Sequence, residues 1–249
     1  MSIELAGVTK AFGDRVILDG ITLAVEEGET LAVIGYSGTG KSVMLKSIVR
    51  LLEPDAGVVH VDGQDVAKLT RDELFELRRR IGYVFQFAAL FDSMTIFDNV
   101  AMGLRRIRMP EAETRERVQE SLHLVDMVGY DDRLPAQLSG GQRKRVGLAR
   151  AIATRPKYVL YDEPTTGLDP VTTAVIDGLI LKMAAELKVT SVVVTHDMKS
   201  AYRVANRVAM LYDGGIRYIG TPDQIQRVED PVVRGFIEGR PELAEGADA

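Results

Sequence analysis

Cysteine and tryptophan are both missing from this 249-residue sequence, and aromatic residues make up only 6% of it. The absence of cysteine excludes disulfide bonds and thiolate metal sites, which fits a reducing compartment. A surplus of basic charge is missing as well, since the formal net charge is −5 and the sequence pI is about 5.4. Because nonspecific nucleic-acid binding requires a basic surface, this composition argues against a nucleic-acid partner.

Long uncharged apolar runs are also missing. No stretch approaches the roughly 18 residues that a membrane helix needs. The opening Met1-Ser2-Ile3-Glu4 has neither the basic nor the apolar region of a signal peptide. We therefore expect a soluble protein that acts at a membrane only through a partner. With 46% hydrophobic and 27% charged residues, the composition is that of a globular protein with enough material for a core.

The most informative pattern is a glycine-rich loop. Residues 35–42 match the phosphate-binding pattern G-x-x-x-x-G-K-[ST] at every fixed position. The apolar run Thr30–Ile34 enters the loop as a strand, and apolar residues at helical spacing leave it over 43–52, which is the context that the motif requires. Glycines let successive backbone N–H groups point into one concavity, and the helix start adds partial positive charge. The loop therefore predicts binding of a nucleoside triphosphate.

Two side chains of this loop have specific expected roles. Lys41 should reach the outer phosphates as a point charge, and the hydroxyl of Ser42 should ligate Mg²⁺. The predicted nucleotide-binding residues of this segment are Gly35, Tyr36, Ser37, Gly38, Thr39, Gly40, Lys41, Ser42 and Val43.

A pair of acidic residues follows a second apolar strand. Tyr158–Tyr161 resembles a buried parallel strand, and it runs directly into Asp162 and Glu163. Ligand groups in open parallel sheets lie at the carboxyl ends of strands. Neighbouring residues on an extended chain point in opposite directions, so we assign Asp162 to Mg²⁺ and Glu163 to the attacking water as general base. The alternative is a polar strand end that caps a turn.

A second glycine-rich segment precedes a helix predicted to run to about residue 154. Ser139 and Gln142 have the spacing of a capping box, and a well-capped helix is the simplest interpretation. However, Gly140 and Gly141 in the first turn each cost about 1 kcal/mol relative to alanine, which indicates that something approaches the backbone closely. A second glycine-lined helix start is a second anion site, which points to two chains sharing two nucleotides. The predicted residues are Leu138, Ser139, Gly140, Gly141 and Gln142.

Three further polar residues follow strands or begin helices. Gln86 lies just past a strand over 81–85, and His196 lies just past a strand over 190–194. Each is a weak signal by itself, because a polar residue at a strand end is usually part of a turn. Asp169-Pro170 has the pattern of an N-cap followed by proline in the first helical position, a structural role that stands whatever else Asp169 does.

The order of the elements predicts an α/β fold. The first 30 residues alternate strand patterns with expected turns at Gly7, Gly13-Asp14, Asp19-Gly20 and Glu27-Gly28, which indicates a small antiparallel sheet. The middle of the chain, over about 87–156, is mostly helical. From residue 158 onward strands alternate with helices, which is typical of a mostly parallel sheet covered by helices.

These motifs, in this order along essentially the whole chain, resemble the ATP-binding cassette (ABC) family. The resemblance implies a P-loop NTPase (RecA-like) fold with an N-terminal antiparallel β subdomain and an inserted α-helical subdomain. It implies one ABC ATPase domain over 1–249, with a core of 1–86 and 157–238, a helical insertion over about 87–156 and a tail over about 239–249. It also implies ATP hydrolysis with Mg²⁺.

The resemblance further implies roles for individual residues. Two copies would close head to tail, so that Ser139-Gly140-Gly141 of one copy completes the γ-phosphate site of the other. Gln86 would contact Mg²⁺ and the lytic water and signal to a membrane permease. His196 would hold the γ-phosphate, and Asp169 would pass between the two sites. Phe12 would stack on adenine, or alternatively belong to the core. Tyr36 stands where many relatives have other residues, with little expected consequence because only its backbone should matter.

A closer resemblance is to the ATPase subunits of bacterial Mla-type phospholipid transporters. It is carried by residues 38–43, by 85–92 (Phe-Gln-Phe-Ala-Ala-Leu-Phe-Asp) and by 234–240 (Arg-Gly-Phe-Ile-Glu-Gly-Arg). It implies an inner-membrane permease, an MCE-type lipid-binding protein, a possible STAS-domain regulator and a place at the cytoplasmic face of the inner membrane. Phe87, Leu90, Phe91 and Met94 would be apolar anchors for the permease, or alternatively part of the subdomain core.

Other functions remain open at this stage. Within transporters, the alternative is an importer of a polar nutrient such as an amino acid, a metal or a sugar. A non-transport ABC ATPase is a further alternative, although nucleic-acid clamps insert long coiled coils and ribosome factors usually carry two cassettes in one chain. A P-loop metabolite kinase would not need Leu138–Gln142.

Overall fold

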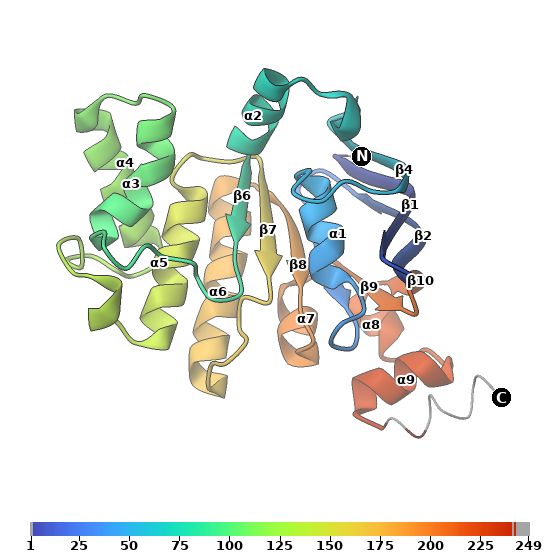
Figure 1. Ribbon diagram of the computed structural model, residues 1–249. Coiled ribbons are helices and arrows are strands. Elements are labelled where there is room, and N and C mark those ends of the chain that lie inside the picture. The colour runs from blue at the N-terminus through green and yellow to red at the C-terminus, as the bar shows by residue number, and fades with distance from the viewer. Residues whose placement is uncertain (1, 241, 243–249) are drawn as a thin grey trace. The chain divides into compact units, whose positions relative to one another are not determined.

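The computed structural model describes residues 2–240 and 242, and the chain divides into two compact units. Unit 1 comprises Met1–Leu74 and Thr190–Ala249, and unit 2 comprises Phe75–Val189 (Figure 1). This division into compact units falls at other residues than the predicted subdomain boundaries at 86/87 and 156/157. It does not test those boundaries, which stay a prediction. Most of the predicted tail over 239–249 lies outside the described residues.

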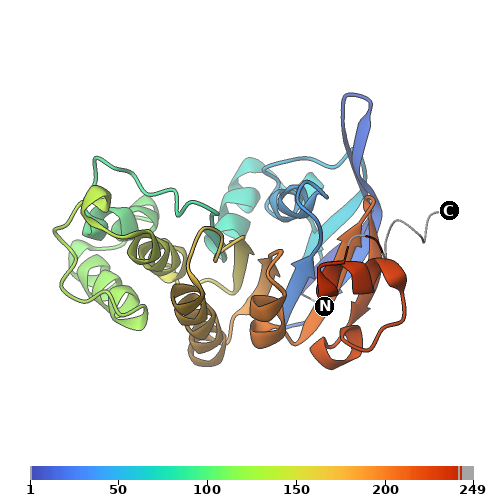
Figure 2. The same ribbon diagram turned by 90° about the horizontal axis from the view of Figure 1, so that it is seen from below.

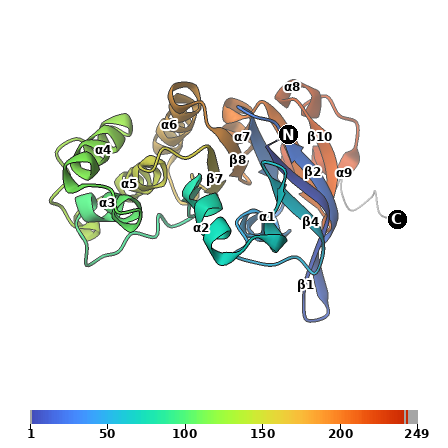
Figure 3. The same cartoon turned by 90° about the horizontal axis from the view of Figure 1, so that it is seen from above.

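Unit 1 contains an antiparallel sheet in the order β2-β1-β4-β5. Its strands are β1 (Ile3–Phe12), β2 (Arg15–Val25), β4 (Ala56–Val61) and the short β5 (Gln64–Asp65). The β1–β2 hairpin extends well beyond the rest of unit 1 (Figures 2 and 3). The antiparallel sheet confirms the prediction from the sequence.

Two of the turns expected in this region are wrong. At Gly7 and Gly20 the strands continue, and the backbone takes positive φ values of 61° and 63°. The β1–β2 register shifts between Leu5 and Val8 and again between Val8 and Lys10. Glycine in the left-handed region produces a β-bulge as readily as a turn, and local sequence does not distinguish the two.

Unit 1 also carries parallel strands around β3 (Thr30–Ile34), all five residues of which are buried. Strands β8 (Thr190–Val194) and β9 (Arg207–Tyr212) flank it in parallel, and β10 (Gly215–Gly220) pairs antiparallel with β9. The helices of this unit are α1 (Lys41–Ile48), α7 (Met198–Val204), α8 (Pro222–Ile225) and α9 (Pro231–Glu238), with the 3-10 turn η1 (Val66–Lys68). The mostly parallel arrangement with helices confirms the predicted fold class.

One buried cluster joins α7, α8 and α9 to the strands of unit 1. Its members are Ala32, Ile34, Ala201, Val208, Met210, Ile225, Val232 and Val233, each with no exposed surface. The C-terminal helices therefore form part of the core that supports the end of β3, which is where the glycine-rich loop begins.

Unit 2 contains parallel strands β6 (Ile81–Val84) and β7 (Tyr158–Asp162), with helices α3 (Ile96–Arg106), α4 (Glu111–Leu124), α5 (Gly140–Ile152) and α6 (Pro170–Leu187). The 3-10 turn η2 (Pro135–Gln137) precedes α5, and α2 (Arg71–Arg79) contains the boundary between the two units. Helices α3, α4 and α5 lie together (Figures 1 and 3). A side chain on Gly82 of β6 would meet the carbonyl oxygen of Ala151 at 2.4 Å, so glycine there lets the end of α5 approach the strand.

Among residues 2–240 and 242, no helix combines the length and the apolar character that a membrane crossing requires.

Candidate functional site

The glycine-rich loop has a backbone that only glycine adopts easily. Gly38 and Gly40 have φ values of 81° and 100°, in the left-handed region. A Cβ on Gly40 would meet Leu18 at 2.7 Å, and a Cβ on Gly35 would meet the carbonyl oxygen of Leu211 at 2.4 Å. Nothing lies within 4 Å of the Cβ position of Gly38. The outer glycines are thus held against neighbouring strands, and the space beside Gly38 is open, as a phosphate cradle requires.

Lys41 begins α1 and is 5% exposed. Its Nζ donates hydrogen bonds of 2.8 Å to the carbonyl oxygens of Gly35 and Tyr36. The ammonium group therefore lies over the loop that the phosphates would occupy. Ser42 is the second residue of α1, at the helix start where the N–H groups and the positive end of the dipole favour an anion.

A hollow of about 450 Å³ adjoins this loop in unit 1. Its lining comes from β2, from the loop and from the turn between β9 and β10. The lining residues are Arg15, Val16, Ile17, Tyr36, Ser37, Gly38, Thr39, Tyr212, Asp213 and Gly214. Six of these, the ones outside the loop, were not predicted from the sequence, because nothing in their local pattern marks them and only the sheet brings them to the loop.

The expectation that only the backbone of Tyr36 matters stays a prediction, but its side chain has contacts of its own. Its ring packs edge-on against Phe236 of α9, with ring centroids 4.9 Å apart, and lies 6.3 Å from the ring of Tyr212. The sequence did not indicate this contact, because α9 is about 200 residues away in the chain and only the folded structure brings it to the loop.

Phe12 and His196 also belong to unit 1. Phe12 is 49% exposed at the end of β1, with Nζ of Lys10 5.6 Å from its ring centroid, so it is not a core aromatic. Its stacking on adenine stays a prediction. His196 is exposed between β8 and Asp197, which caps α7 by accepting hydrogen bonds from the N–H groups of Lys199 and Ser200.

The acidic pair lies in unit 2 at the carboxyl end of β7. Both residues are nearly buried, with Asp162 6% and Glu163 9% exposed. The hydroxyl of Tyr83 donates to Oδ2 of Asp162 at 3.1 Å, and the hydroxyl of Thr166 donates to Oε2 of Glu163 at 2.8 Å. Burial and the nearby Asp162 carboxylate raise the pKa of Tyr83, which keeps its hydroxyl protonated as a donor.

The prediction that Asp162 and Glu163 point in opposite directions because the chain is extended there is wrong. The chain is not extended at Glu163, where φ is 52°. The strand ends at Asp162 and the backbone turns into the left-handed region, which costs energy for a non-glycine residue and persists where surrounding structure enforces it. The two carboxylates differ instead in their neighbours, a tyrosine for Asp162 and a threonine for Glu163.

The Leu138–Gln142 segment forms the capping box that its spacing predicts. The N–H of Gln142 donates to the Ser139 hydroxyl at 3.2 Å, and the N–H of Ser139 donates to the Gln142 side chain at 2.9 Å. A Cβ on Gly141 would meet Cγ2 of Thr172 at 2.5 Å, whereas nothing lies within 4 Å of the Cβ position of Gly140. The close approach expected at this helix start is therefore made at Gly141 by a side chain of the same unit, and at Gly140 the backbone is open.

Thr172 also joins this helix start to Asp169. Asp169 caps α6 by accepting hydrogen bonds from the N–H groups of Val171 and Thr172, at 2.9 and 3.0 Å. The Thr172 hydroxyl donates to its second oxygen at 2.5 Å. The hydrogen bonds from Thr172 lower the pKa of Asp169 most, so the carboxylate is charged at neutral pH. The N-cap role predicted for Asp169 is what the structure shows.

Helix α5 also holds the segment that follows Gln86. Nζ of Lys144 donates to the backbone carbonyls of Gln86 and Glu163. Arg150 donates to the carbonyls of Ala88 and Ala89, at 2.6 Å each. Ala88 and Ala89 both have positive φ, and a Cβ on Gly147 would lie 3.3 Å from Ala88. One face of α5, at positions 144, 147 and 150, therefore contacts the backbone of the segment Gln86–Ala89 and fixes its position. The sequence did not single out these three residues.

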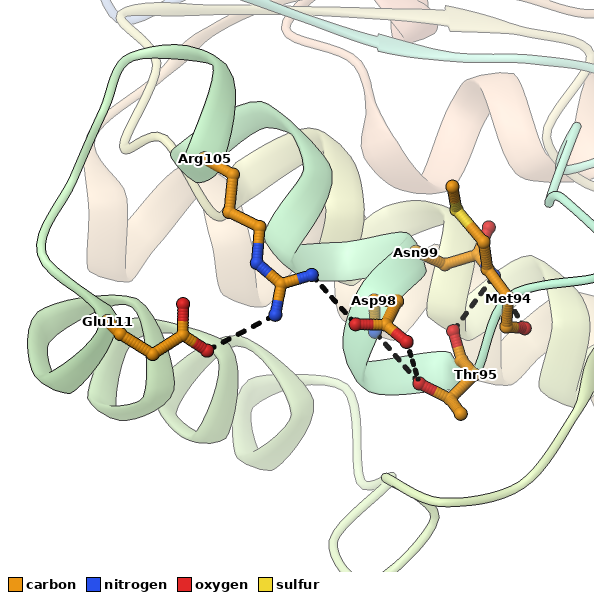
Figure 4. A network of polar contacts seen from close by, with 6 residues as sticks. All are labelled: Met94, Thr95, Asp98, Asn99, Arg105 and Glu111. Carbon is orange, nitrogen blue, oxygen red and sulfur yellow. Dashed lines mark hydrogen bonds and ion pairs between the residues drawn. The ribbon is translucent and has the colours of Figure 1, made fainter.

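A buried asparagine fixes the continuation of the same segment. Asn99, with no exposed surface, accepts from the N–H of Phe91 at 2.8 Å and donates to the carbonyls of Phe91, Met94 and Thr95. Figure 4 shows Asn99 beside Met94 and Thr95, with Arg105 bridging Asp98 and Glu111 nearby. Asn99 is a polar residue inside an apolar helix pattern, which is the one signal that could have identified it.

The apolar side chains on this held backbone point outward. Phe87 is 81% exposed, Phe91 49% and Met94 36%, and Leu90 is half-buried. Three of the four are thus outside the subdomain core, which was one of the two interpretations open from the sequence.

The predicted metal ligands are the hydroxyl of Ser42, the side-chain oxygen of Gln86 and the carboxylate of Asp162. All three are hard oxygen donors of the kind that Mg²⁺ prefers. Asp162 is buried, and the hydrogen bond from Tyr83 fixes one of its oxygens. Each residue therefore fits the ion in its chemistry.

Comparison with known proteins identifies the family. A family model described as ABC transporter matches residues 18–166. The chain is 42% identical over 241 residues to the probable ribonucleotide transport ATP-binding protein mkl of Mycobacterium tuberculosis, covering 96% of this chain and 67% of that protein. It is 42% identical over 239 residues to the sulfate/thiosulfate import ATP-binding protein CysA of Synechocystis, covering 95% and 66%.

A solved structure supports the same family assignment. The dimeric post-hydrolysis state of the ATP-binding cassette MJ0796 bound to ADP and Pi has a TM-score of 0.80 to this chain at 36% identity, covering 88% of this chain and 98% of that one. The phosphate loop, the acidic pair and the Leu138–Gln142 segment are all present in a fold of this kind. The chain therefore belongs to the ABC transporter family, and it is an ATP-binding and ATP-hydrolysing cassette.

Proposed function

We propose that this cassette works as a pair of identical copies that power a separate membrane permease, and that the cargo is a phospholipid or a related lipid. The proposal of a permease rests on the exposed apolar side chains of the segment 87–94. Phe87, Phe91 and Met94 of this segment are exposed, while hydrogen bonds from Asn99 and Arg150 fix its backbone. Exposed apolar groups on a fixed backbone are typical of a docking surface.

The same contacts supply a route from that surface to the chemistry. Lys144 of helix α5 donates hydrogen bonds to the carbonyl oxygen of Gln86, next to the segment 87–94, and to that of Glu163 in the acidic pair. A permease that moves the segment 87–94 would therefore move helix α5 as well. Because Ser139 and Gly140 begin that helix, the movement would reach the part that a second copy needs to complete its nucleotide site.

Each predicted residue has a place in the proposed reaction. The phosphate loop and Lys41 bind the phosphates, and Glu163 accepts a proton from the attacking water. Bound Mg²⁺ would neutralise charge on the phosphate oxygens, with Ser42, Gln86 and Asp162 as its protein ligands. His196 would hold the γ-phosphate, Asp169 would lie in the segment that passes between the two nucleotide sites, and Phe12 would stack on adenine.

The phospholipid cargo rests on the resemblance of residues 38–43, 85–92 and 234–240 to Mla-type ATPases. It brings with it the proposed inner-membrane permease, the MCE-type protein, a STAS-domain regulator and a place at the cytoplasmic face of that membrane. The second candidate is import of a small polar anion, and the observation that favours it is the 42% identity to a sulfate/thiosulfate import ATP-binding protein.

The ATPase part is tested with Glu163→Gln. This variant should keep its affinity for ATP, lose nearly all turnover and accumulate as a nucleotide-bound dimer. Lys41→Ala is the matched control, because it should lose nucleotide affinity and remain monomeric. If Glu163→Gln hydrolyses ATP at near the original rate, Glu163 is not the base.

The permease and the cargo are tested by copurification from membranes, with identification of the bound proteins and lipids. An integral membrane protein with an MCE-domain protein and phospholipid would support the proposal, and a soluble binding protein for an anion would support the second candidate. Phe87→Ser together with Phe91→Ser should abolish recovery of the permease. Val128→Ser, which changes another exposed apolar residue of unit 2, should not. Equal recovery with all variants would remove the segment 87–94 from the proposal.

A further inference from the structure

The phosphate loop of unit 1 carries one aromatic side chain, and it packs on the C-terminal helix of the same unit. Tyr36 is half-buried against the cluster that contains Val232 and Val233. Its ring meets that of Phe236 at an interplanar angle of 78°, the edge-to-face arrangement that aromatic pairs favour. The contact joins a residue of the phosphate loop to a helix that lies about 200 residues later in the chain.

Hydrogen bonds and an ion pair fix the start of helix α9. Asp230 caps it by accepting hydrogen bonds from the N–H groups of Val232 and Val233, at 3.0 and 3.1 Å. Arg217 of β10 pairs with the other oxygen of Asp230 at 2.9 Å. Figure 3 shows α9 beside β10 and α8 in unit 1. Phe236 is thus presented from a helix whose start is fixed to the sheet and whose apolar face is in the core.

The backbone of Tyr36 is part of the phosphate cradle. Its carbonyl oxygen accepts from Nζ of Lys41 at 2.8 Å and from the hydroxyl of Thr39 at 2.9 Å. The preceding residue, Gly35, lies too close to Leu211 of β9 to tolerate a side chain. The loop therefore starts between two supports, β9 on the Gly35 side and α9 on the Tyr36 side, and Tyr36 also lines the adjoining hollow.

We propose that Phe236 is a positioning residue for the phosphate loop, so that the packing of α9 sets the affinity of the loop for nucleotide. The proposal rests on the nucleotide binding of the proposed function. By thermodynamic linkage, nucleotide binding must in turn strengthen the packing of α9 by the same factor. Helix α9 would then pack more tightly when nucleotide is bound at the phosphate loop, and anything that displaces the helix would weaken binding of the nucleotide.

The size of the effect follows from the contact. An edge-to-face aromatic pair contributes beyond simple burial by an amount equivalent to about 2- to 10-fold in an equilibrium constant. Phe236→Ala and Tyr36→Ala should each raise the dissociation constant for MgADP several-fold. MgADP is the appropriate probe because it reports on the phosphate loop of one chain without turnover.

The test is a double-mutant cycle in the full chain, with a fluorescent ADP analogue and Mg²⁺. The double variant Tyr36→Ala/Phe236→Ala should bind no more weakly than the worse single variant, because the two residues act through one contact. Ile237→Ala is the matched control, since Ile237 packs on the same cluster from the same helix. It should lower the melting temperature and leave the dissociation constant for MgADP close to that of the original protein, because the ring contact between Phe236 and Tyr36 is kept. Additive effects of Phe236→Ala and Tyr36→Ala would overturn the proposal.

A second measurement covers the case in which Phe236→Ala does not fold. The chain has no tryptophan, so Phe236→Trp places a single tryptophan at the contact, which can be excited at wavelengths that the eight tyrosines do not absorb. MgADP should change its emission, and the change should be lost in Phe236→Trp/Lys41→Ala. Binding of the nucleotide analogue with no change in tryptophan emission would overturn the proposal, whereas failure to bind nucleotide at all would instead contradict the proposed function.

Discussion

The hydroxyl of Tyr83 donates a hydrogen bond of 3.1 Å to Oδ2 of Asp162, which joins the carboxyl ends of the parallel strands β6 and β7. Groups that orient a metal-binding carboxylate typically change metal affinity by about 10- to 100-fold when they are removed. We expect Tyr83→Phe to raise the Mg²⁺ concentration for half-maximal ATPase activity by about 10-fold. Phe85→Leu is the control, because it removes the ring 4.5 Å from that of Tyr83 and keeps the hydroxyl. An unchanged Mg²⁺ dependence in Tyr83→Phe would show that Asp162 is oriented by other groups.

Gly141 and Thr172 provide a test of why glycine is needed in the first turn of α5. We expect Gly141→Ala to reduce ATPase activity by about 10-fold or more, since overpacking of this kind costs about 1–3 kcal/mol. Thr172 cannot easily turn aside, because a β-branched side chain is stiff in a helix and its hydroxyl is bonded to Asp169.

The matched rescue is Gly141→Ala/Thr172→Ser, which removes the Thr172 methyl group and keeps its hydroxyl. Steady-state ATPase activity should recover in large part. If the double variant remains inactive, Gly141 is needed for the approach of another molecule and not for packing against Thr172.

Arg150 should control the mobility of the segment that follows Gln86. Loss of its hydrogen bonds to Ala88 and Ala89 should lower the unfolding free energy by about 2–3 kcal/mol and loosen that backbone. Because the chain has no cysteine, Phe87→Cys gives a single site for a spin label. The label should become more mobile when Arg150→Met is added. Arg155→Met, which breaks an exposed ion pair with Glu120, should leave the spectrum unchanged. Equal spectra for both variants would contradict this role of Arg150.

Lys144 gives a pH-dependent prediction. Burial lowers its pKa below the usual 10.5, and the charge of Glu163 opposes this shift. Between the lowered pKa and 10.5 the unfolded chain binds the proton more tightly than the folded protein does, so raising the pH through this window favours folding. The original protein should therefore gain stability relative to Lys144→Met as the pH approaches 10.5. Denaturant unfolding across this range measures the difference, and a difference that does not change with pH would contradict the prediction.

Much of the fold could be predicted because its signals are local. The strands Thr30–Ile34 and Thr190–Val194 have the bounds that their patterns predict. The capping box of Ser139 and Gln142 depends on two residues three positions apart, and the structure contains it. Such features are fixed by neighbours in the chain, where spacing and residue type are sufficient.

Asn99 acts on neighbours four to eight positions away, but other residues that sequence reasoning missed act across long separations. Lys144 contacts the backbone of Gln86, 58 positions earlier, and Arg150 contacts Ala88, 62 positions earlier. Neither forms a pattern with its partner, because the acceptors are backbone carbonyls that any residue could supply. The bulges at Gly7 and Gly20 and the turn of the backbone at Glu163 escaped prediction for a related reason, since strand pairing and packing decide between the conformations that the local sequence allows.

By itself, the sequence determined the motifs of this ATPase: a loop of glycines with Lys41 and Ser42, an acidic pair after an apolar strand, and a capped helix start for which we propose a second anion site. These need only a few contiguous residues of the right type. The tertiary structure alone decided how the parts are held, with Phe236 against Tyr36, Thr172 against Gly141, and Lys144 and Arg150 on the segment after Gln86. The physical reason is that packing and hydrogen bonding to backbone depend on distance in space, which the order of residues along the chain does not record.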